Sequence, residues 1–112
     1  MAERRVYSGY YTLAAGATGS VSIFRVPPGR VATIRRVQFY FPAGSNGELY
    51  VALSTGGKRL VPESGMINGD NNTVSVEPNK TATSGFTVDL DYMNTSSTES
   101  HSVFVLLEVD VE

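Results

Sequence analysis

The sequence predicts an all-β fold: a two-sheet antiparallel β-sandwich, jelly-roll-like, with about eight strands and essentially no helix. Three observations support this prediction. Short segments that alternate apolar and polar residues recur along the whole chain. Clusters rich in Gly, Pro, Asn and Ser separate them at the spacing typical of sandwiches and barrels. No segment repeats apolar residues with helical period over three turns free of Gly and Pro.

The composition is that of one globular domain, predicted to span residues 1–112. The chain is 41% hydrophobic and 18% charged, with 11 Gly and 5 Pro, which suits short strands joined by tight turns. It has no Cys, which excludes disulfides and thiolate metal sites. No apolar run is long enough to span a membrane, and no apolar stretch follows the N-terminal arginines as in a signal peptide. We therefore expect no membrane insertion.

Four strands are predicted in the first half of the chain. The second ends at Pro27-Pro28-Gly29, because proline cannot donate to a sheet ladder and glycine permits the turn. The third is the longest and ends at the turn-forming segment PAGSNG, residues 42–47. The four predicted strands are Val6–Leu13, Val21–Val26, Val31–Phe41 and Glu48–Ser54.

Four more strands are predicted in the second half, separated by polar loops at 62–72, 78–85 and 93–100. From Phe86 to Tyr92 every even-numbered residue is apolar and every odd-numbered one is polar. Such alternation is typical of a strand with one buried face. The four predicted strands are Arg59–Val61, Thr73–Val76, Phe86–Tyr92 and Ser102–Val111.

One irregularity predicts a β-bulge. In the third strand Val37, Phe39 and Phe41 share one parity, whereas Ile34 has the other. An extra residue near Arg35-Arg36 would bring both sets to the same face of the sheet. Bulges of this kind let a strand bend between two packed sheets.

The last strand is apolar on both faces. Its odd-numbered residues from Val103 to Val111 form the expected inward row, but Phe104 and Leu106 lie on the opposite row. Such a strand is either central and covered outside or part of a subunit interface. We favour the interface, because so small a sandwich has little left to cover an outer face. Phe104, Leu106, Arg35 and Arg36 are the candidate interface residues.

Charge is distributed unevenly along the chain, although the net charge is only −2. Residues 1–59 carry eight basic residues and two acidic ones, and residues 60–112 carry one basic residue and nine acidic ones. One interpretation is a bipolar surface that docks on copies of itself or on a charged partner. The other, which we favour, is local pairing of charges between neighbouring N-terminal and C-terminal strands.

The sequence holds no catalytic constellation that we recognise, and we expect no enzyme, no metal and no cofactor. His101 is the only histidine, whereas the metal sites of jelly-roll enzymes need several imidazoles. Its neighbours Glu99 and Ser100 do not complete a triad, because residues adjacent in sequence point apart. We expect His101 to be an exposed loop residue.

Three aspartates permit cation binding without predicting it. Asp89 and Asp91 share a strand face at a spacing compatible with paired carboxylates, but the alternation makes that face the solvated one. Asp70 lies in Gly69-Asp70-Asn71-Asn72, which resembles a β-turn more than a calcium loop. Gly56-Gly57-Lys58 lacks the rest of a phosphate-binding loop.

Two ligand classes remain open. Arginines interleave with Phe24, Phe39 and Tyr40, as in surfaces that bind single-stranded nucleic acid, but a pI near 5.3 argues against that partner. A carbohydrate-binding module is the alternative function, because sandwiches can present aromatic platforms to sugars. The arginines are Arg25, Arg30, Arg35 and Arg36, and the candidate platform residues are Tyr7, Tyr10, Tyr11, Tyr40, Tyr50 and Tyr92.

The segment VSIFRVPPGRVATIRRVQFYFPAGSNGELYVALSTGGKRLVPESG resembles small jelly-roll accessory proteins of phage and archaeal virus particles. In these a strand ends at V-P-P-G, a long strand of T-I-R-R-V type follows, and a short strand precedes a Gly-rich hairpin. The resemblance covers roughly residues 20–110. It implies a virion component that decorates or cements a capsid, or sits on a fibre or tail. The implied partners are copies of itself, as a homo-oligomer such as a trimer, and other virion proteins.

Overall fold

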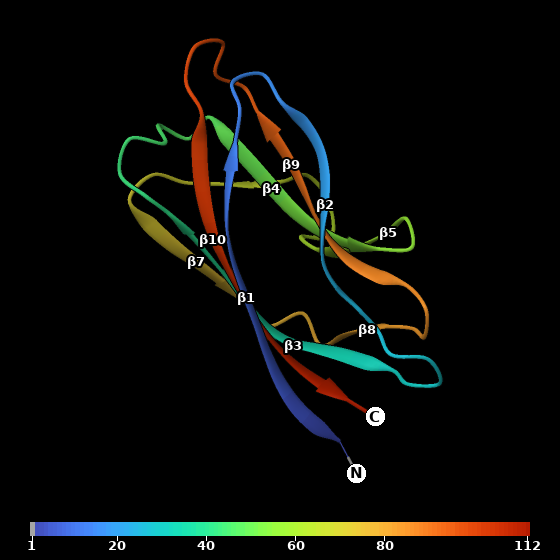
Figure 1. The fold of residues 1–112 in the computed structure, drawn as a ribbon. Coiled ribbons are helices and arrows are strands. Elements are labelled where there is room, and N and C mark those ends of the chain that lie inside the picture. The colour runs from blue at the N-terminus through green and yellow to red at the C-terminus, as the bar shows by residue number, and fades with distance from the viewer. Residues whose placement is uncertain (1) are drawn as a thin grey trace.

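Two five-stranded antiparallel sheets pack face to face in the computed structural model, which describes residues 2–112 (Figure 1). The described residues contain no helix, and hence none that could cross a membrane. The predicted fold class, a jelly-roll-like antiparallel β-sandwich, is therefore confirmed. In each sheet the chain supplies four strands in one continuous path and a short fifth strand beside them.

Residues 2–112 form ten strands rather than about eight. Sheet A contains β1 (Glu3–Leu13), β3 (Ala32–Phe41), β7 (Asn72–Val76), β8 (Lys80–Ala82) and β10 (His101–Val111). Sheet B contains β2 (Thr18–Arg25), β4 (Leu49–Thr55), β5 (Lys58–Val61), β6 (Ile67–Asn68) and β9 (Thr87–Asn94). The additional strands are β6 and β8, which lie in segments predicted to be loops. With two and three residues they are too short to show a side-chain period, and backbone pairing alone defines them.

The strand order places the last strand in the middle of a sheet. Sheet A runs β1-β10-β3-β7, with β8 also on β3, and sheet B runs β2-β9-β4-β5, with β6 also on β4. Consecutive strands from β1 to β4 alternate between the sheets, as in a jelly roll. Glu3 pairs with Val111, so the two ends of the chain lie side by side at one end of the molecule (Figure 1).

The predicted bulge in β3 is confirmed. Arg36 pairs with Glu108 and Ile34 pairs with Val109, which leaves Arg35 as the extra residue. As a result, the inward side chains of β3 on both sides of the bulge face the core and are fully buried. They are Ile34, Val37, Phe39 and Phe41. The inward row of β10, from Val103 to Val111, is also buried, as predicted.

One predicted core residue lies at the surface. The alternation from Phe86 to Tyr92 places Phe86 inward, but its side chain is 50% exposed. Phe86 precedes β9 and belongs to a turn, in which its N–H donates to the carbonyl of Thr83. The ring lies over Gly56, where an added Cβ would come within 2.9 Å of it. The alternation holds only from the first residue of β9, with Val88 and Leu90 fully buried.

Candidate interaction surface

An exposed row of aromatic side chains crosses three neighbouring strands of sheet A. Tyr10 on β1 pairs with Phe104 on β10, and Phe104 pairs with Tyr40 on β3. Directly opposed side chains on antiparallel strands are close neighbours, with Cβ atoms roughly 5 Å apart. The exposed fractions are 62% for Tyr10, 38% for Phe104 and 41% for Tyr40. We call these three residues the aromatic strip.

Apolar surface continues beside the aromatic strip along the same face. Ser8, Leu106 and Gln38 form the next row across β1, β10 and β3. Leu106 is half-buried in this row. Val6, one row further along β1, is 57% exposed. Leu106 and Val6 thus extend the apolar surface beyond the aromatic strip, beside the polar residues Ser8 and Gln38.

Ion pairs occupy the end of this face nearest the chain termini. Asp110 on β10 lies between two arginines, 2.5 Å from Arg4 on β1 and 2.7 Å from Arg35 on β3. The hydrogen bonds donated by Arg4 and Arg35 hold the pKa of the Asp110 carboxyl below its usual range. Arg36 Nε lies 2.8 Å from Glu108 as an ion pair, without the alignment of a hydrogen bond. These contacts support the interpretation of the charge asymmetry as local pairing between neighbouring strands.

All four predicted interface residues lie on the outer face of sheet A. Phe104 is in the aromatic strip and Leu106 is beside it, while Arg35 and Arg36 form the ion pairs at its end. Their role in an interface stays a prediction. Sequence reasoning missed that Tyr10 and Tyr40 flank Phe104. The parity of β1 already set Tyr10 apart from its inward residues, but only the strand pairing reveals the alignment.

The six candidate platform tyrosines separate into two groups. Tyr7 stacks on Phe24 of β2 between the sheets, with ring centroids 4.2 Å apart, and Tyr11 and Tyr92 also pack against the core. Tyr50 is half-buried. Tyr10 and Tyr40 therefore present the most exposed rings of the six.

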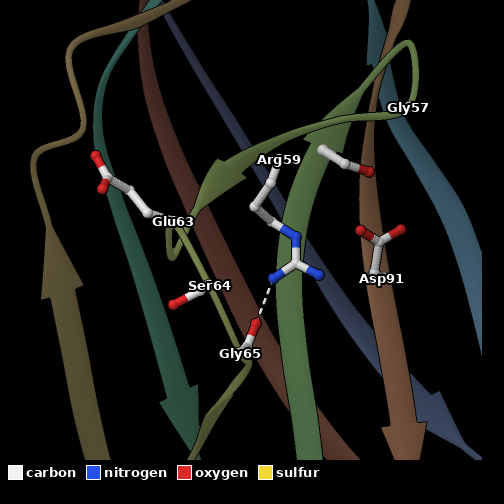
Figure 2. Close-up of a pocket in the computed structure, with 7 residues that line it drawn as sticks. Gly57, Arg59, Glu63, Ser64, Gly65 and Asp91 are labelled. Carbon is white, nitrogen blue, oxygen red and sulfur yellow. Dashed lines mark hydrogen bonds between the residues drawn. The ribbon is translucent and has the colours of Figure 1, made fainter.

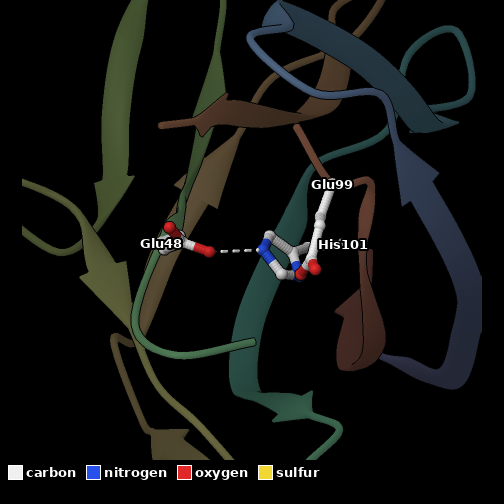
Figure 3. Close-up of side chains that lie close together, drawn as sticks. All are labelled: Glu48, Glu99 and His101. Atoms are coloured by element: carbon white, nitrogen blue, oxygen red, sulfur yellow. Dashed lines mark hydrogen bonds and ion pairs between the residues drawn. The ribbon is translucent and has the colours of Figure 1, made fainter. Parts of the chain in front are cut away.

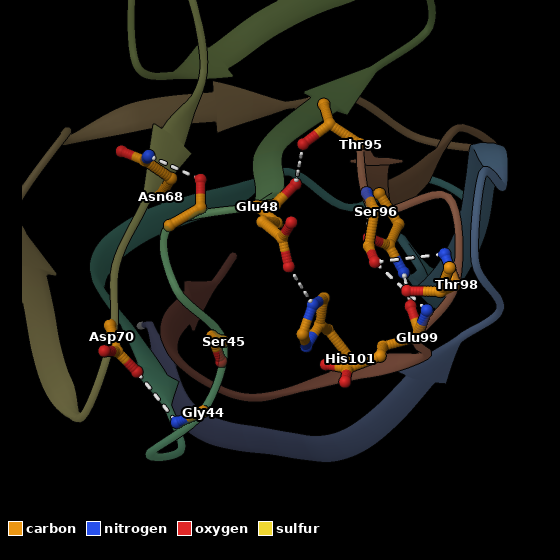
Figure 4. Close-up of polar contacts among 12 residues, drawn as sticks. Gly44, Ser45, Glu48, Asn68, Asp70, Thr95, Ser96, Thr98, Glu99 and His101 are labelled. Carbon is orange, nitrogen blue, oxygen red and sulfur yellow. Dashed lines mark hydrogen bonds and ion pairs between the residues drawn. The ribbon is translucent and has the colours of Figure 1, made fainter.

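Two of the aspartates singled out in the sequence accept hydrogen bonds from neighbouring segments, and the third lines a pocket. Asp89 accepts a hydrogen bond of 3.0 Å from Ser22. Asp91 lines an open pocket of about 400 Å³ together with Arg59, whose guanidinium donates to the carbonyl of Gly65 (Figure 2). Asp70 accepts a hydrogen bond of 2.9 Å from the Gly44 N–H (Figure 4). In residues 2–112 none of these carboxylates joins a cluster of metal-ligating side chains.

His101 is not an exposed loop residue, and that prediction is wrong. It is the first residue of β10, is 6% exposed, and its Nε2 lies 2.8 Å from Glu48 Oε1 (Figure 3). The preceding loop is tied down by the buried Asn94, so the strand begins earlier than the polar sequence suggests. No sequence signal connects His101 with Glu48, which lies 53 positions away.

The arginines considered for nucleic acid make contacts within the protein. Arg25 donates to the carbonyl of Gly85 at 3.0 Å, and Arg30 donates to that of Val111 at 3.3 Å. Arg35 and Arg36 form the ion pairs with acidic residues of β10 described above. Each guanidinium thus has a partner in its own chain, which reduces what it offers to a phosphate.

The fold is similar to those of known capsid chains. A chain of the capsid asymmetric unit of cyanophage Pam1 is 14% identical, with a TM-score of 0.58 over 97% of this chain and 85% of that one. A chain of the acid-stable capsid of Helicobacter pylori bacteriophage KHP30 is also 14% identical, with a TM-score of 0.55 over 97% and 93%.

The same architecture occurs in other proteins. The structure of FLHE is 13% identical to this chain, with a TM-score of 0.50 over 96% of both chains. No protein-family model matches the sequence, and no curated protein matches it either. Because all these identities are low, the similarity shows a shared jelly-roll-like fold alone. A function has to be argued from the residues on the surface.

Proposed function

We propose that this protein is a non-enzymatic structural component of a virion, acting through protein–protein contacts of the outer face of sheet A. The observation that carries the proposal is the exposed aromatic strip of Tyr10, Phe104 and Tyr40, which crosses three neighbouring strands of that face. The similarity of the fold to capsid chains of two phages supports the virion setting. Such a component decorates or cements the capsid, or is an accessory of a fibre or tail.

The residue types on the face resemble the anatomy of a protein interface. Interfaces are enriched in Tyr, Phe and Arg, with apolar residues at the centre and polar ones at the rim. Here Phe104 lies between two tyrosines, while Arg35 and Arg36 lie farther along β3, on the side of the chain termini. The arginine ion pairs are partly exposed, so they contribute to orientation more than to affinity.

The first partner of this face is a second copy of the chain, in a symmetric homo-oligomer such as a trimer. The strip supplies about 1 kcal/mol per aromatic residue on burial, since each ring is already partly covered. That is too little for tight binding by the strip alone. Other virion proteins are the remaining partners, and they add contacts that a lone oligomer lacks.

Light scattering coupled to size-exclusion chromatography tests the proposal. We expect the wild type to form an oligomer at high micromolar concentration and Phe104→Asp to shift it toward monomer, because a buried carboxylate in the contact is costly. Phe86→Asp is the matched control, since Phe86 is 50% exposed and lies outside this face. A wild type that stays monomeric and binds no other virion protein contradicts the proposal.

Carbohydrate binding is the second candidate function, and the same strip favours it. Tyr10 and Tyr40 present open rings on a sheet face, as a platform that stacks on sugars does. Binding to a glycan array that is lost in Tyr10→Ala and Tyr40→Ala would support this function. A silent array combined with stable self-assembly would reject it.

A further inference from the structure

Three metal-ligating side chains meet at the end of the sandwich opposite the chain termini. They are Glu48 just before β4, Glu99 in the β9–β10 loop and His101 at the start of β10 (Figure 3). One ligand atom from each lies within 4.8 Å of those of the other two. Between residues 2 and 112 this is the one group of three or more such side chains. It brings together both sheets and the loop between them.

The imidazole of this cluster is held in place. His101 is 6% exposed, and its Nε2 shares a proton with Glu48 Oε1 across 2.8 Å. This contact fixes the orientation of the ring, with Nε2 facing the Glu48 carboxylate. The orientation that this contact fixes is also the one that a metal ion at this position requires.

Buried backbone contacts fix the two glutamates. The Glu48 carbonyl accepts hydrogen bonds from both the N–H and the Oγ1 of Thr95, at 2.9 and 2.8 Å. The Asn94 side-chain amide donates to the carbonyls of Leu13, Ala14 and Glu99, and the Ser96 hydroxyl accepts from the Glu99 N–H at 3.0 Å. Asn94 and Ser96 are themselves buried. The loop is thereby held with Glu99 beside His101.

No contact with the described residues explains why the Glu99 carboxylate lies beside Glu48 and His101. Glu99 is exposed, and its carboxylate makes no hydrogen bond or ion pair with the described residues, although it lies close to a second carboxylate. Two carboxylates so close repel each other unless a positive charge lies between them. A divalent cation supplies that charge and uses the donor atoms of all three residues.

We propose that Glu48, Glu99 and His101 form a binding site for a divalent transition-metal ion of the Zn²⁺ type. One imidazole nitrogen and two carboxylates, without thiolates, suit Zn²⁺ or Co²⁺ rather than Ca²⁺ or Mg²⁺, which prefer oxygen alone. Tetrahedral ligands of Zn²⁺ lie roughly 3.3 Å apart, so the exposed Glu99 side chain closes the site by a small rotation. A water in the adjacent open pocket of about 220 Å³, which Glu99 and His101 line, completes the coordination.

Binding at this site joins the two sheets and stabilises the folded state. Glu48 leads into β4 of sheet B and His101 begins β10 of sheet A, so the ion cross-links the layers. An ion that binds the folded state alone raises the unfolding temperature. The site does not depend on the proposed virion role.

Zn²⁺ titration by calorimetry, with the chain first stripped of metal by a chelator, tests the site. We expect saturable 1:1 binding and a higher melting temperature in the presence of Zn²⁺. Glu99→Gln should weaken binding at least about tenfold without lowering the metal-free melting temperature, because the Glu99 side chain is exposed. Co²⁺ absorption bands in the visible should weaken in the same variant.

Glu77→Gln is the matched control, since Glu77 is exposed and lies in the segment between β7 and β8, away from the cluster. It should bind Zn²⁺ like the wild type. Equal Zn²⁺ affinity in Glu99→Gln and wild type overturns the proposal. So does the absence of saturable binding of both Zn²⁺ and Co²⁺ up to about 100-fold molar excess over the protein at neutral pH.

Discussion

Asn94 is the single residue on which most loop contacts at the far end of the sandwich converge. Its amide donates to three carbonyls, and its Oδ1 accepts from the Ser96 N–H at 3.0 Å. The side chain is 2% exposed, so no solvent replaces these partners on truncation. This amide group therefore contributes strongly to the order of this end, together with the contacts of Thr95 and Ser96.

Asn94→Ala should destabilise the fold by about 2–4 kcal/mol, because it leaves buried backbone acceptors without a donor. Urea denaturation followed by circular dichroism measures the change. Ser97→Ala, at an exposed position in the same loop, should alter stability by less than about 0.5 kcal/mol. Equal stabilities for the two variants would show that the amide does not hold the loop.

The Asp110 carboxylate makes the stability of the fold depend on pH in the acidic range. Its pKa is lowered in the folded state by hydrogen bonds from Arg4 and Arg35, relative to about 3.9 in an unfolded chain. The stability it contributes is therefore present above the unfolded pKa and is lost as the pH falls through the folded one. Asp110→Asn should be less stable than wild type at pH 6, and the difference should shrink by pH 2. Urea midpoints at the two pH values test this, and a difference independent of pH would contradict it.

At the scale of the element, the bulge in β3 keeps one strand in register with two sets of inward residues. Arg35 is the extra residue, and without it Ile34 and Val37 could not both face the core. Deleting Arg35 should abolish cooperative folding, because either side of the strand would turn its apolar row outward. Arg35→Ala keeps the bulge and should cost less than about 1 kcal/mol. Chemical-shift dispersion and urea unfolding separate the two, and a stably folded deletion variant would refute the argument.

Elements with a clear period were predictable, whereas their partners were not. Alternation of apolar and polar residues predicted the strands of five or more residues. The difference in parity between Ile34 and Val37 also predicted the bulge. The two- and three-residue strands β6 and β8 gave no period to read. The alignment of Tyr10 with Phe104 and the contact of His101 with Glu48 depend on pairing between distant segments. Only the part of the candidate surface that lies on β10 could thus be predicted from the sequence.

At the scale of the whole molecule, the topology sets the folding rate. The strands at the two ends of the chain pair along their full lengths, from Glu3 with Val111 to Leu13 with His101. Such distant pairing must close a long loop before its contacts form, so all-β sandwiches refold in milliseconds to seconds. Stopped-flow dilution from urea, followed by tyrosine fluorescence, should show this range. Refolding complete within microseconds would rule out the pairing of the terminal strands as a limiting step.

The pairing of Glu3 with Val111 also means that both chain ends can be attached to a support at the same end of the molecule. A tag or partner domain attached at either end would emerge from the same pole, beside the other end (Figure 1). The β9–β10 loop, residues 95–100, lies at the opposite pole of a body 46 Å long. A chain anchored to a support by both ends would consequently hold that loop, with Glu99, farthest from the support and open to the medium.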